Sequence, residues 1–167
     1  MTATKVKLAW AAGLIDGEGC ISLTRRSPQR TNGAVNPNYR LILKVTMCHE
    51  GTVRALLDLF KVGTIHAQAQ QQSYWTKAWI WHCNAEDAEK VLQQIKPYML
   101  TKLEEAEVAL DFLAQTDRNR AGKARKLTPE DVARREIFFC RLRDLKTCNQ
   151  SKAKKEIYQA TLGKHHN

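Results

Sequence analysis

The chain has 167 residues, 43% of them hydrophobic and 26% charged, and a formal net charge of +10 at pH 7. This length and composition predict one globular domain over residues 1–167 and exclude a membrane span, because no run approaches the roughly 20 apolar residues that a span needs. The excess of positive charge favours a polyanionic partner.

A helix is predicted over residues 5–16, which lack proline and place Val6, Trp10 and Leu14 at helical spacing. Small residues recur every four positions and therefore share one helix face: Ala9, Gly13 and Gly17. A face of small residues lets another backbone approach closely. Such an approach would offset the roughly 1 kcal/mol by which a helical glycine is less favourable than alanine.

Two carboxylates stand where this helix ends. Asp16 and Glu18 lie at the C-terminal end, where the helix dipole is negative and carboxylates are disfavoured. Carboxylate oxygens and free carbonyls at a helix end together form a hard oxygen site that suits Mg²⁺ or Ca²⁺. The alternative is an acidic turn that only ends the helix.

Two strands are predicted next, at residues 20–26 and 39–47, because polar and apolar residues alternate there. One face is apolar and consists of Ile21, Leu23, Leu41, Leu43 and Val45. The other face can donate to phosphates and base edges through Ser22, Thr24, Arg26, Arg40 and Lys44. The basic connection over residues 27–38, which contains Arg30, either reaches along a DNA groove or is a mobile loop.

A core-facing helix is predicted over residues 50–60, followed by a third strand from Gly63 and a fourth over residues 74–82. Opposite the inward Ile65, the third strand presents Thr64, His66, Gln68 and Gln70. Glutamine can pair bidentately with adenine, so these glutamines are either base readers or part of a solvated turn. The sequence does not decide which side of the fourth strand faces the core. Core packing is favoured for its tryptophans, Trp75, Trp79 and Trp81.

Helices are predicted over residues 85–96, with Asn84 as the cap, and over residues 101–114. The resulting order, α-β-β-α-β-β-α, predicts an α+β fold with one antiparallel four-stranded sheet. Helices would cover one face of the sheet and leave the other open to a partner.

Residues 116–167 are predicted to form a basic helical extension to a core at residues 5–115. A helix begins at Thr128 and Pro129, residues 146–155 are predicted as a basic loop, and a short helix then runs to Leu162. This tail either contacts phosphates or serves solubility.

Acidic residues are unevenly distributed along the chain. No Asp or Glu occurs in residues 19–49 or 62–85, which contain Arg25, Arg26, Arg30, Arg40, Lys44 and Lys77. Such stretches favour a surface that faces nucleic acid, although strands are in any case poor in Asp and Glu.

The five cysteines include no CxxC pair, which indicates free thiols in a reducing compartment. No secretory signal is visible at the N-terminal end. The sequence therefore predicts an intracellular protein of the cytoplasm, nucleoid or an organelle.

Residues 11–19, AAGLIDGEG, resemble the LAGLIDADG motif of the homing endonucleases, which are often associated with introns. The departures are Ala11 for Leu, Gly17 for Ala, and Glu18 for the usual Asp. The resemblance extends over roughly residues 5–115, with one copy of the motif and no internal repeat. It implies a site-specific double-strand DNA endonuclease.

Family members with one motif are homodimers whose motif helices pack at a twofold axis, so the resemblance implies a homodimer and a near-palindromic target. The implied interface residues are Ala9, Ala12, Gly13 and Asp16. The DNA-binding residues would be Ser22, Thr24, Arg26, Arg30, Arg40, Lys44, His66, Gln68, Gln70 and Lys77.

The resemblance also implies a divalent cation, Mg²⁺ with Ca²⁺ or Mn²⁺ as substitutes, held by Glu18 and the Gly17 carbonyl. Glu18 and Lys102 would be the catalytic residues. Where many relatives have a polar residue at the end of the second strand, this chain has Met47. Cys48 or His49 is the candidate replacement, and Arg54 is a further candidate for the basic pocket.

Two other functions stay open on the sequence. The first is a relative that binds nucleic acid without cleaving it, as an RNA maturase or a DNA-binding regulator. The second is a generic basic structural or RNA-binding protein, which leaves the motif unexplained.

Overall fold

A computed structural model describes residues 5–27, 36–69, 74, 76–116 and 127–162, with side chains as far as residue 147. Arg30, Gln70, Trp75 and the side chain of Cys148 lie outside the described residues. The elements are α1 (Lys5–Glu18), β1 (Gly19–Arg26), β2 (Asn38–Met47), α2 (Glu50–Phe60), β3 (Thr64–Ala67), β4 (Trp79–Asn84), α3 (Ala85–Ile95), the 3₁₀ turn η2 (Lys96–Tyr98), α4 (Leu103–Gln115) and α5 (Pro129–Leu162). The predicted α-β-β-α-β-β-α order is confirmed from α1 to α3, and the helices α4 and α5 follow it.

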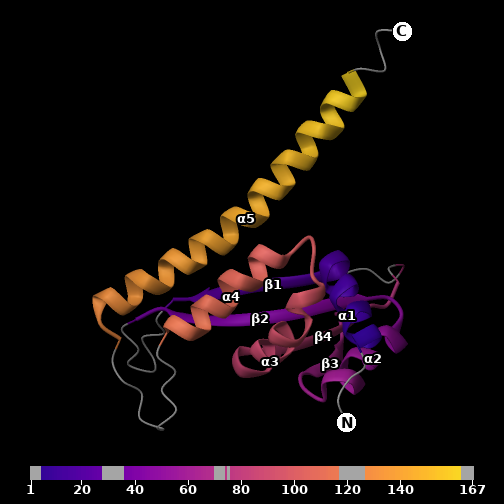
Figure 1. The fold of residues 1–167 in the computed structure, drawn as a ribbon, viewed down its shortest axis with the longest axis horizontal. Coiled ribbons are helices and arrows are strands. Elements are labelled where there is room, and N and C mark those ends of the chain that lie inside the picture. Colours follow the sequence, from indigo (N-terminus) through magenta and orange to yellow (C-terminus); the bar gives the residue numbers. More distant parts are fainter. Residues whose placement is uncertain (1–4, 28–35, 70–73, 75, 117–126, 163–167) are drawn as a thin grey trace.

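The four strands form one antiparallel sheet in the order β1-β2-β4-β3 (Figure 1). The register places apolar residues opposite one another, Ile21 with Leu43 and Val45 with Trp81. Helices α1 to α4 pack on this face, and its side chains form the centre of the core. The predicted alternation of faces along β1 and β2 is therefore confirmed.

The turn from α1 into β1 depends on the missing side chain of Gly19. A Cβ atom at this position would lie 2.5 Å from the backbone oxygen of Ile15, so no larger residue fits without moving the helix. The last turn of α1 thus lies directly against the first residue of the strand, and Gly19 pairs with Val45 of β2.

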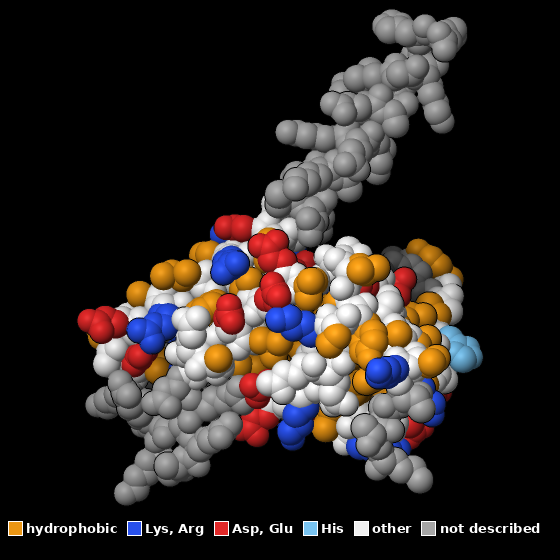
Figure 2. Space-filling model, in the orientation of Figure 1, with side chains coloured by type: hydrophobic (Ala, Val, Ile, Leu, Met, Phe, Trp, Pro, Cys, Tyr) orange, Lys and Arg blue, Asp and Glu red, His pale blue; other side chains and the backbone are white. Residues whose placement is uncertain are grey.

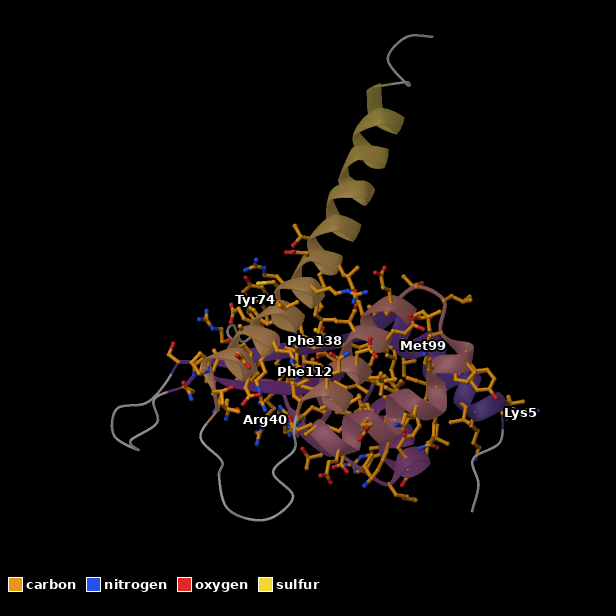
Figure 3. All side chains as sticks on the ribbon, turned by 60° about the vertical axis from the view of Figure 1, so that its left-hand side comes forward. Lys5, Arg40, Tyr74, Met99, Phe112 and Phe138 are labelled. Carbon is orange, nitrogen blue, oxygen red and sulfur yellow. The ribbon has the colours of Figure 1, made fainter. Side chains whose placement is uncertain are left out.

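Helix α5 packs along α4 and β1 and contributes to the same core. The Phe138 ring meets the Phe112 ring of α4 edge to face, with centroids 5.9 Å apart (Figure 3). At the sheet edge, Glu136 accepts a hydrogen bond from the Tyr39 hydroxyl and pairs with Arg25 at 3.2 Å. The beginning of α5 has a reciprocal cap, because Asp131 N–H donates to Thr128 Oγ1 and Thr128 N–H donates to the Asp131 carboxylate.

The prediction of a basic loop over residues 146–155 is wrong, because α5 continues as one helix to Leu162. The C-terminal half of this helix projects beyond the body of the molecule (Figure 1). No proline or glycine occurs after Pro129 as far as Leu162. Lysine, alanine, glutamine and glutamate are good helix formers, so high polarity alone does not end a helix.

The side chains of Cys20, Cys48, Cys83 and Cys140 are free thiols. Burial raises the pKa of the Cys83 thiol to about 12, so this thiol is protonated at neutral pH. Across the described residues, no helix combines the length and apolar character that crossing a membrane requires.

Candidate metal and nucleic-acid site

The Asp16 carboxylate organises the segment that leads into α4. It accepts the backbone N–H groups of Leu100 at 2.7 Å, Thr101 at 3.2 Å and Lys102 at 2.9 Å. These N–H groups precede the helix and have no partner within it, and a carboxylate near a helix N-terminus is favoured by the dipole. Asp16 therefore fixes where α4 begins relative to α1.

Lys102 completes the contact in the opposite direction. Its Nζ donates to the carbonyl oxygen of Ile15 at 3.2 Å, to that of Asp16, and to that of Gly17 at 3.4 Å. A cation at the C-terminal end of a helix is stabilised by free carbonyl groups and by the dipole. We call this two-way arrangement the Asp16–Lys102 clasp.

The oxygen atoms at the end of α1 suit a divalent cation. Three carbonyl groups already converge on one ammonium group, and the exposed carboxylate of Glu18 follows directly. However, no cluster of three or more His, Cys, Asp or Glu side chains that could hold a metal ion exists within the described part of the chain. A cation here would therefore need further ligands from water, phosphate or a second chain.

The outer face of α1 is unusually bare. Val6 is 78% exposed and Trp10 42% exposed, and Ala9 is exposed between them. A Cβ atom added at Gly13 or at Gly17 would meet no described atom within 4 Å, so no contact with the described part of the chain explains why these positions are glycine. The predicted close approach of another backbone to this face would explain the two glycines.

Ala12 does not belong to this face. It is fully buried in the core of its own chain, together with Ala11 and Ile15. The prediction that Ala12 lies at a dimer interface is therefore wrong, because its side chain turns about 100° away from that of Gly13 on an α-helix.

The uncovered side of the sheet has a polar surface that contains most of the predicted DNA-binding residues. Its residues are Ser22, Thr24, Arg26, Arg40, Ile42, Lys44, Thr46, Thr64, His66, Ile80 and His82, which we call the open face. One row crosses all four strands, because Cys20 pairs with Lys44, Lys44 with His82, and His82 with Thr64. None of the four strands contains a carboxylate, whereas the helix-covered side mixes acidic and basic side chains (Figure 2).

His82 is a residue of the open face that the sequence did not reveal. Its Nδ1 lies 3.3 Å from Thr64 Oγ1, and its ring meets that of His66 with centroids 5.1 Å apart. Burial, and then the charge of His66, lower the pKa of His82. At pH 7 it therefore presents a neutral ring with one donor and one acceptor.

Two predicted DNA-binding residues lie beyond the strands. Gln68 is exposed just after β3, where its backbone N–H donates to the backbone oxygen of Ala78 at 2.8 Å. The Lys77 ammonium lies 4.3 Å from the centroid of the Trp79 ring. Since Trp79 pairs with Met47 in the row that the helices cover, the structure does not bring Lys77 to the open face.

The model of the LAGLIDADG endonuclease family matches residues 11–105, which is more than half of the chain. The chain belongs to this family. Among solved structures, it is similar to the homing endonuclease I-CvuI in complex with the I-CreI target, with 16% identity and a TM-score of 0.67 over 84% of this chain and 82% of that chain.

Two further solved structures share the fold. The archaeal intron-encoded homing endonuclease I-Vdi141I, complexed with DNA, has 15% identity and a TM-score of 0.65, with 84% of each chain covered. The homing endonuclease I-TnaI has 17% identity and a TM-score of 0.61 over 86% of this chain and 96% of that chain. No match was found among curated proteins.

The LAGLIDADG motif thus forms the second half of α1 and its junction with β1, and the clasp lies at its C-terminal end. Near it, β2 ends at the half-buried Met47, and the exposed His49 follows. The His49 ring occupies the space beside Gly51, where a Cβ atom would lie 2.7 Å from His49 Cε1, and His49 Nδ1 lies 3.1 Å from Thr52 Oγ1.

Arg54, the further candidate for a basic pocket, is paired along its own helix. Its Nε donates to the Glu50 carboxylate at 2.7 Å, one turn earlier on α2. The positive charge of Arg54 is therefore partly neutralised by a local i,i+4 pair.

Proposed function

We propose that the chain is a site-specific double-strand DNA endonuclease that acts as a homodimer with a divalent cation. Mg²⁺ is the expected cation, and Ca²⁺ or Mn²⁺ would occupy the same position. The observation that carries the proposal is the convergence of three α1 carbonyl groups, Lys102 and the exposed Glu18 at the end of the motif helix. Membership of the LAGLIDADG endonuclease family supports the same activity.

The bare face of α1 supports the homodimer. Exposed Ala9, Gly13 and Gly17 leave room for a second α1 to approach, and two copies that met there would face each other across a twofold axis. Each copy would bring one Glu18 and one Gly17 carbonyl to that axis. Two chains together would thereby offer the cation two Glu18 carboxylates, whereas a single chain offers one.

The open face supports duplex DNA as the substrate. Arg26, Arg40 and Lys44 would contact phosphates or guanine edges, while Ser22, Thr24 and His66 would contact base edges. The absence of carboxylates from the four strands means that no described strand residue would repel the DNA backbone. The similar I-Vdi141I was solved with DNA, which supports the same class of partner.

Cleavage would follow from the groups at the end of α1. A divalent cation supplies Lewis acidity and lowers the pKa of a bound water. Glu18 and the Gly17 carbonyl would hold that cation, and the Lys102 ammonium would stabilise the negative charge that develops on the attacked phosphate. Each subunit would cut one strand, which gives a staggered break.

A nucleic-acid-binding relative without cleavage, as an RNA maturase or a DNA-binding regulator, is the second candidate. It is favoured by Met47, which places an apolar side chain where the resemblance implies a polar one. The two candidates share the open face and differ in whether Glu18 is needed for a chemical step.

Selection of cut sites from a randomised duplex library in the presence of Mg²⁺ tests cleavage, metal dependence and target symmetry together. On the selected site, we expect Glu18→Gln to abolish cleavage and to leave DNA binding intact. Glu107→Gln, an exposed change on α4 that only removes a surface pair with Lys96, serves as the matched control. Binding of DNA or RNA with no cleavage of any library member would favour the second candidate instead.

A further inference from the structure

A small cleft lies between helix α5 and the edge strand β1. Strand β1 pairs only with β2, so its outer edge is not covered by another strand, and α5 packs along it. The cleft has a volume of about 140 Å³, and its described lining contains two cationic side chains and one hydroxyl: Ser22, Leu23, Phe139, Leu142, Arg143 and Lys146. Because Ser22 also belongs to the open face, the cleft adjoins the surface proposed to bind DNA.

The helical spacing of α5 brings both cations to this cleft. Four residues follow the i, i+3, i+4, i+7 pattern and therefore share one side of the helix: Phe139, Leu142, Arg143 and Lys146. The apolar pair packs inward, since Leu142 is 1% exposed and Phe139 is half-buried. The Arg143 guanidinium lies 6.0 Å from the centroid of the Phe139 ring, so a cation borders the apolar floor of the cleft.

The Lys146 ammonium lacks a strong acceptor. Its Nζ donates to Cys20 Sγ at 3.3 Å, and the structure shows no other acceptor for it among the described residues. Sulfur is a weak acceptor, whereas an ammonium group has three N–H donors. Lys146 is also half-buried, which limits how far water can replace a missing partner. The ammonium group is therefore well suited to bind an anion.

Two acidic side chains lie close to the cleft without lining it. Asp144 Oδ1 is 3.6 Å from Arg143 Nε, but the two side chains are 70% and 63% exposed, so this pair is weak. The Lys146 charge lowers the pKa of the buried Glu105, an effect that the burial of this carboxyl outweighs. The described lining of the cleft itself thus has two positive charges and no carboxylate.

We propose that this cleft is a phosphate site, in which Arg143 and Lys146 bind one backbone phosphate of the duplex that lies on the open face. The inference rests on the proposed function, because it takes duplex DNA as the ligand. Cys20 directly follows the last residue of the motif, so the bound phosphate would lie near the end of α1. Phosphate contacts position a duplex without reading its sequence, and α5 thereby becomes part of the DNA-binding surface.

The test is the affinity for a random duplex as a function of salt, measured by fluorescence anisotropy without a divalent cation. Each neutralised phosphate adds about 0.9 to the slope of log K against log salt. Arg143→Met together with Lys146→Met should therefore reduce the slope by about 1, and the loss of affinity should shrink about fourfold from about 50 mM to about 200 mM salt. An unchanged slope overturns the inference, and a reduction of about 2 overturns the single shared phosphate.

Arg141→Met is the matched control for the single variant Arg143→Met. Arg141 lies two residues earlier on the same helix and therefore points about 200° away, toward Glu104 of α4 at 3.9 Å. Both variants remove one positive charge from α5. Arg143→Met should weaken DNA binding, and Arg141→Met should leave it unchanged. An equal effect of the two variants would mean that only overall charge matters, which overturns the inference.

Two further variants separate phosphate binding from a tether between α5 and β1. Lys146→Arg keeps the charge and should keep the slope, and Cys20→Ala removes the present acceptor and should keep DNA affinity. If Cys20→Ala weakens DNA binding as much as Lys146→Met does, Lys146 acts by holding α5 in place and the inference fails. Thermal unfolding checks that each variant is folded, and the exposed Arg143→Met decides the question if a variant of the half-buried Lys146 does not fold.

Inorganic phosphate is a second source of the same chemistry. Thermal unfolding of the DNA-free protein in phosphate and in chloride, at equal ionic strength, tests this source. If phosphate stabilises the unchanged protein more than the double variant, while both have the same salt slope with DNA, the cleft takes free phosphate and the DNA assignment is wrong. Failure of the unchanged protein to bind any duplex would reject the proposed function and this inference together, whereas binding without cleavage would reject the endonuclease alone.

Discussion

Asp16 and Lys102 bind each other's backbone. The Asp16 carboxylate accepts the Lys102 N–H at 2.9 Å, and Lys102 Nζ donates to the Asp16 carbonyl oxygen. Each side chain thus satisfies the free groups at the end of the other's helix. The residue predicted at the interface and the residue predicted in catalysis are therefore coupled within one chain.

The first prediction concerns the stability that Asp16 provides. Asp16→Ala leaves the N–H groups of Leu100, Thr101 and Lys102 without their acceptor. We expect the free energy of unfolding to fall by about 1–3 kcal/mol, as measured by urea denaturation. Asp111→Ala, an exposed change on α4, should have little effect. An equal loss in both variants would mean that the clasp contributes nothing specific.

The second prediction concerns the bare face of α1. Gly13→Leu should be tolerated by the folded chain, because nothing lies within 4 Å of a Cβ atom there and helix propensity improves by about 1 kcal/mol. The same change should abolish the dimer, which analytical ultracentrifugation measures. Ala114→Leu, on the exposed side of α4, should leave the dimer intact. A strictly monomeric unchanged protein, with and without DNA, would contradict the shared axis.

The third prediction concerns the open face. Lys44 lies in the row that crosses all four strands, so Lys44→Met should weaken DNA binding and should reduce the slope of log K against log salt by about 1. Fluorescence anisotropy over a range of salt concentrations measures both quantities. Lys90→Met, on helix α3 and paired with Asp87, should change neither. A similar effect of both variants would indicate only the loss of overall charge.

The fourth prediction is a pH dependence of stability that arises from Glu105. Burial raises the folded-state pKa of the Glu105 carboxyl above its ordinary value of 4.5, so the folded protein binds this proton more tightly than the unfolded chain does. The stabilising contribution is therefore fully present below about pH 4.5 and is lost as the pH rises through the folded-state pKa. Relative to Glu105→Gln, the unchanged protein should lose stability over this range.

Parallel urea titrations of the two proteins from pH 4 to pH 8 measure this difference. Lys102, Lys146 and Asp16 are the charged groups that act on the Glu105 carboxyl, and all three are present in both proteins. A difference that stays constant with pH would show that Glu105 keeps one protonation state throughout.

The element order and the facing of β1 and β2 follow from the sequence because polar and apolar residues alternate there, with Ile42 as the apolar exception on the polar side. The facing of β4 does not, since Trp79 and Ile80 are both large and apolar. Only the pairing of Thr46 with Ile80, and of Lys44 with His82, places one side of β4 on the open face. His82 was missed for this reason.

The partners within the site could not be predicted either. Glu104 and Glu105 have the same charge and are adjacent in the sequence, yet Glu104 is exposed and pairs with Arg141 of α5, whereas Glu105 is buried. Similarly, Ala12 and Gly13 are both small, and only the packing of the core separates the inner from the outer side of α1. Such distinctions depend on contacts between segments far apart in the chain.

The tight turn at Gly19 has a consequence for engineering this protein. No side chain fits between Ile15 and that glycine. The backbone at Glu18 is therefore held in a fixed position relative to the first strand. Under the proposed function, the open face and the cleavage site at Glu18 would therefore keep a fixed spacing. Residues on the outward side of the strands should therefore be exchangeable for new sequence preferences while the cut stays at the same distance from the bases that are recognised.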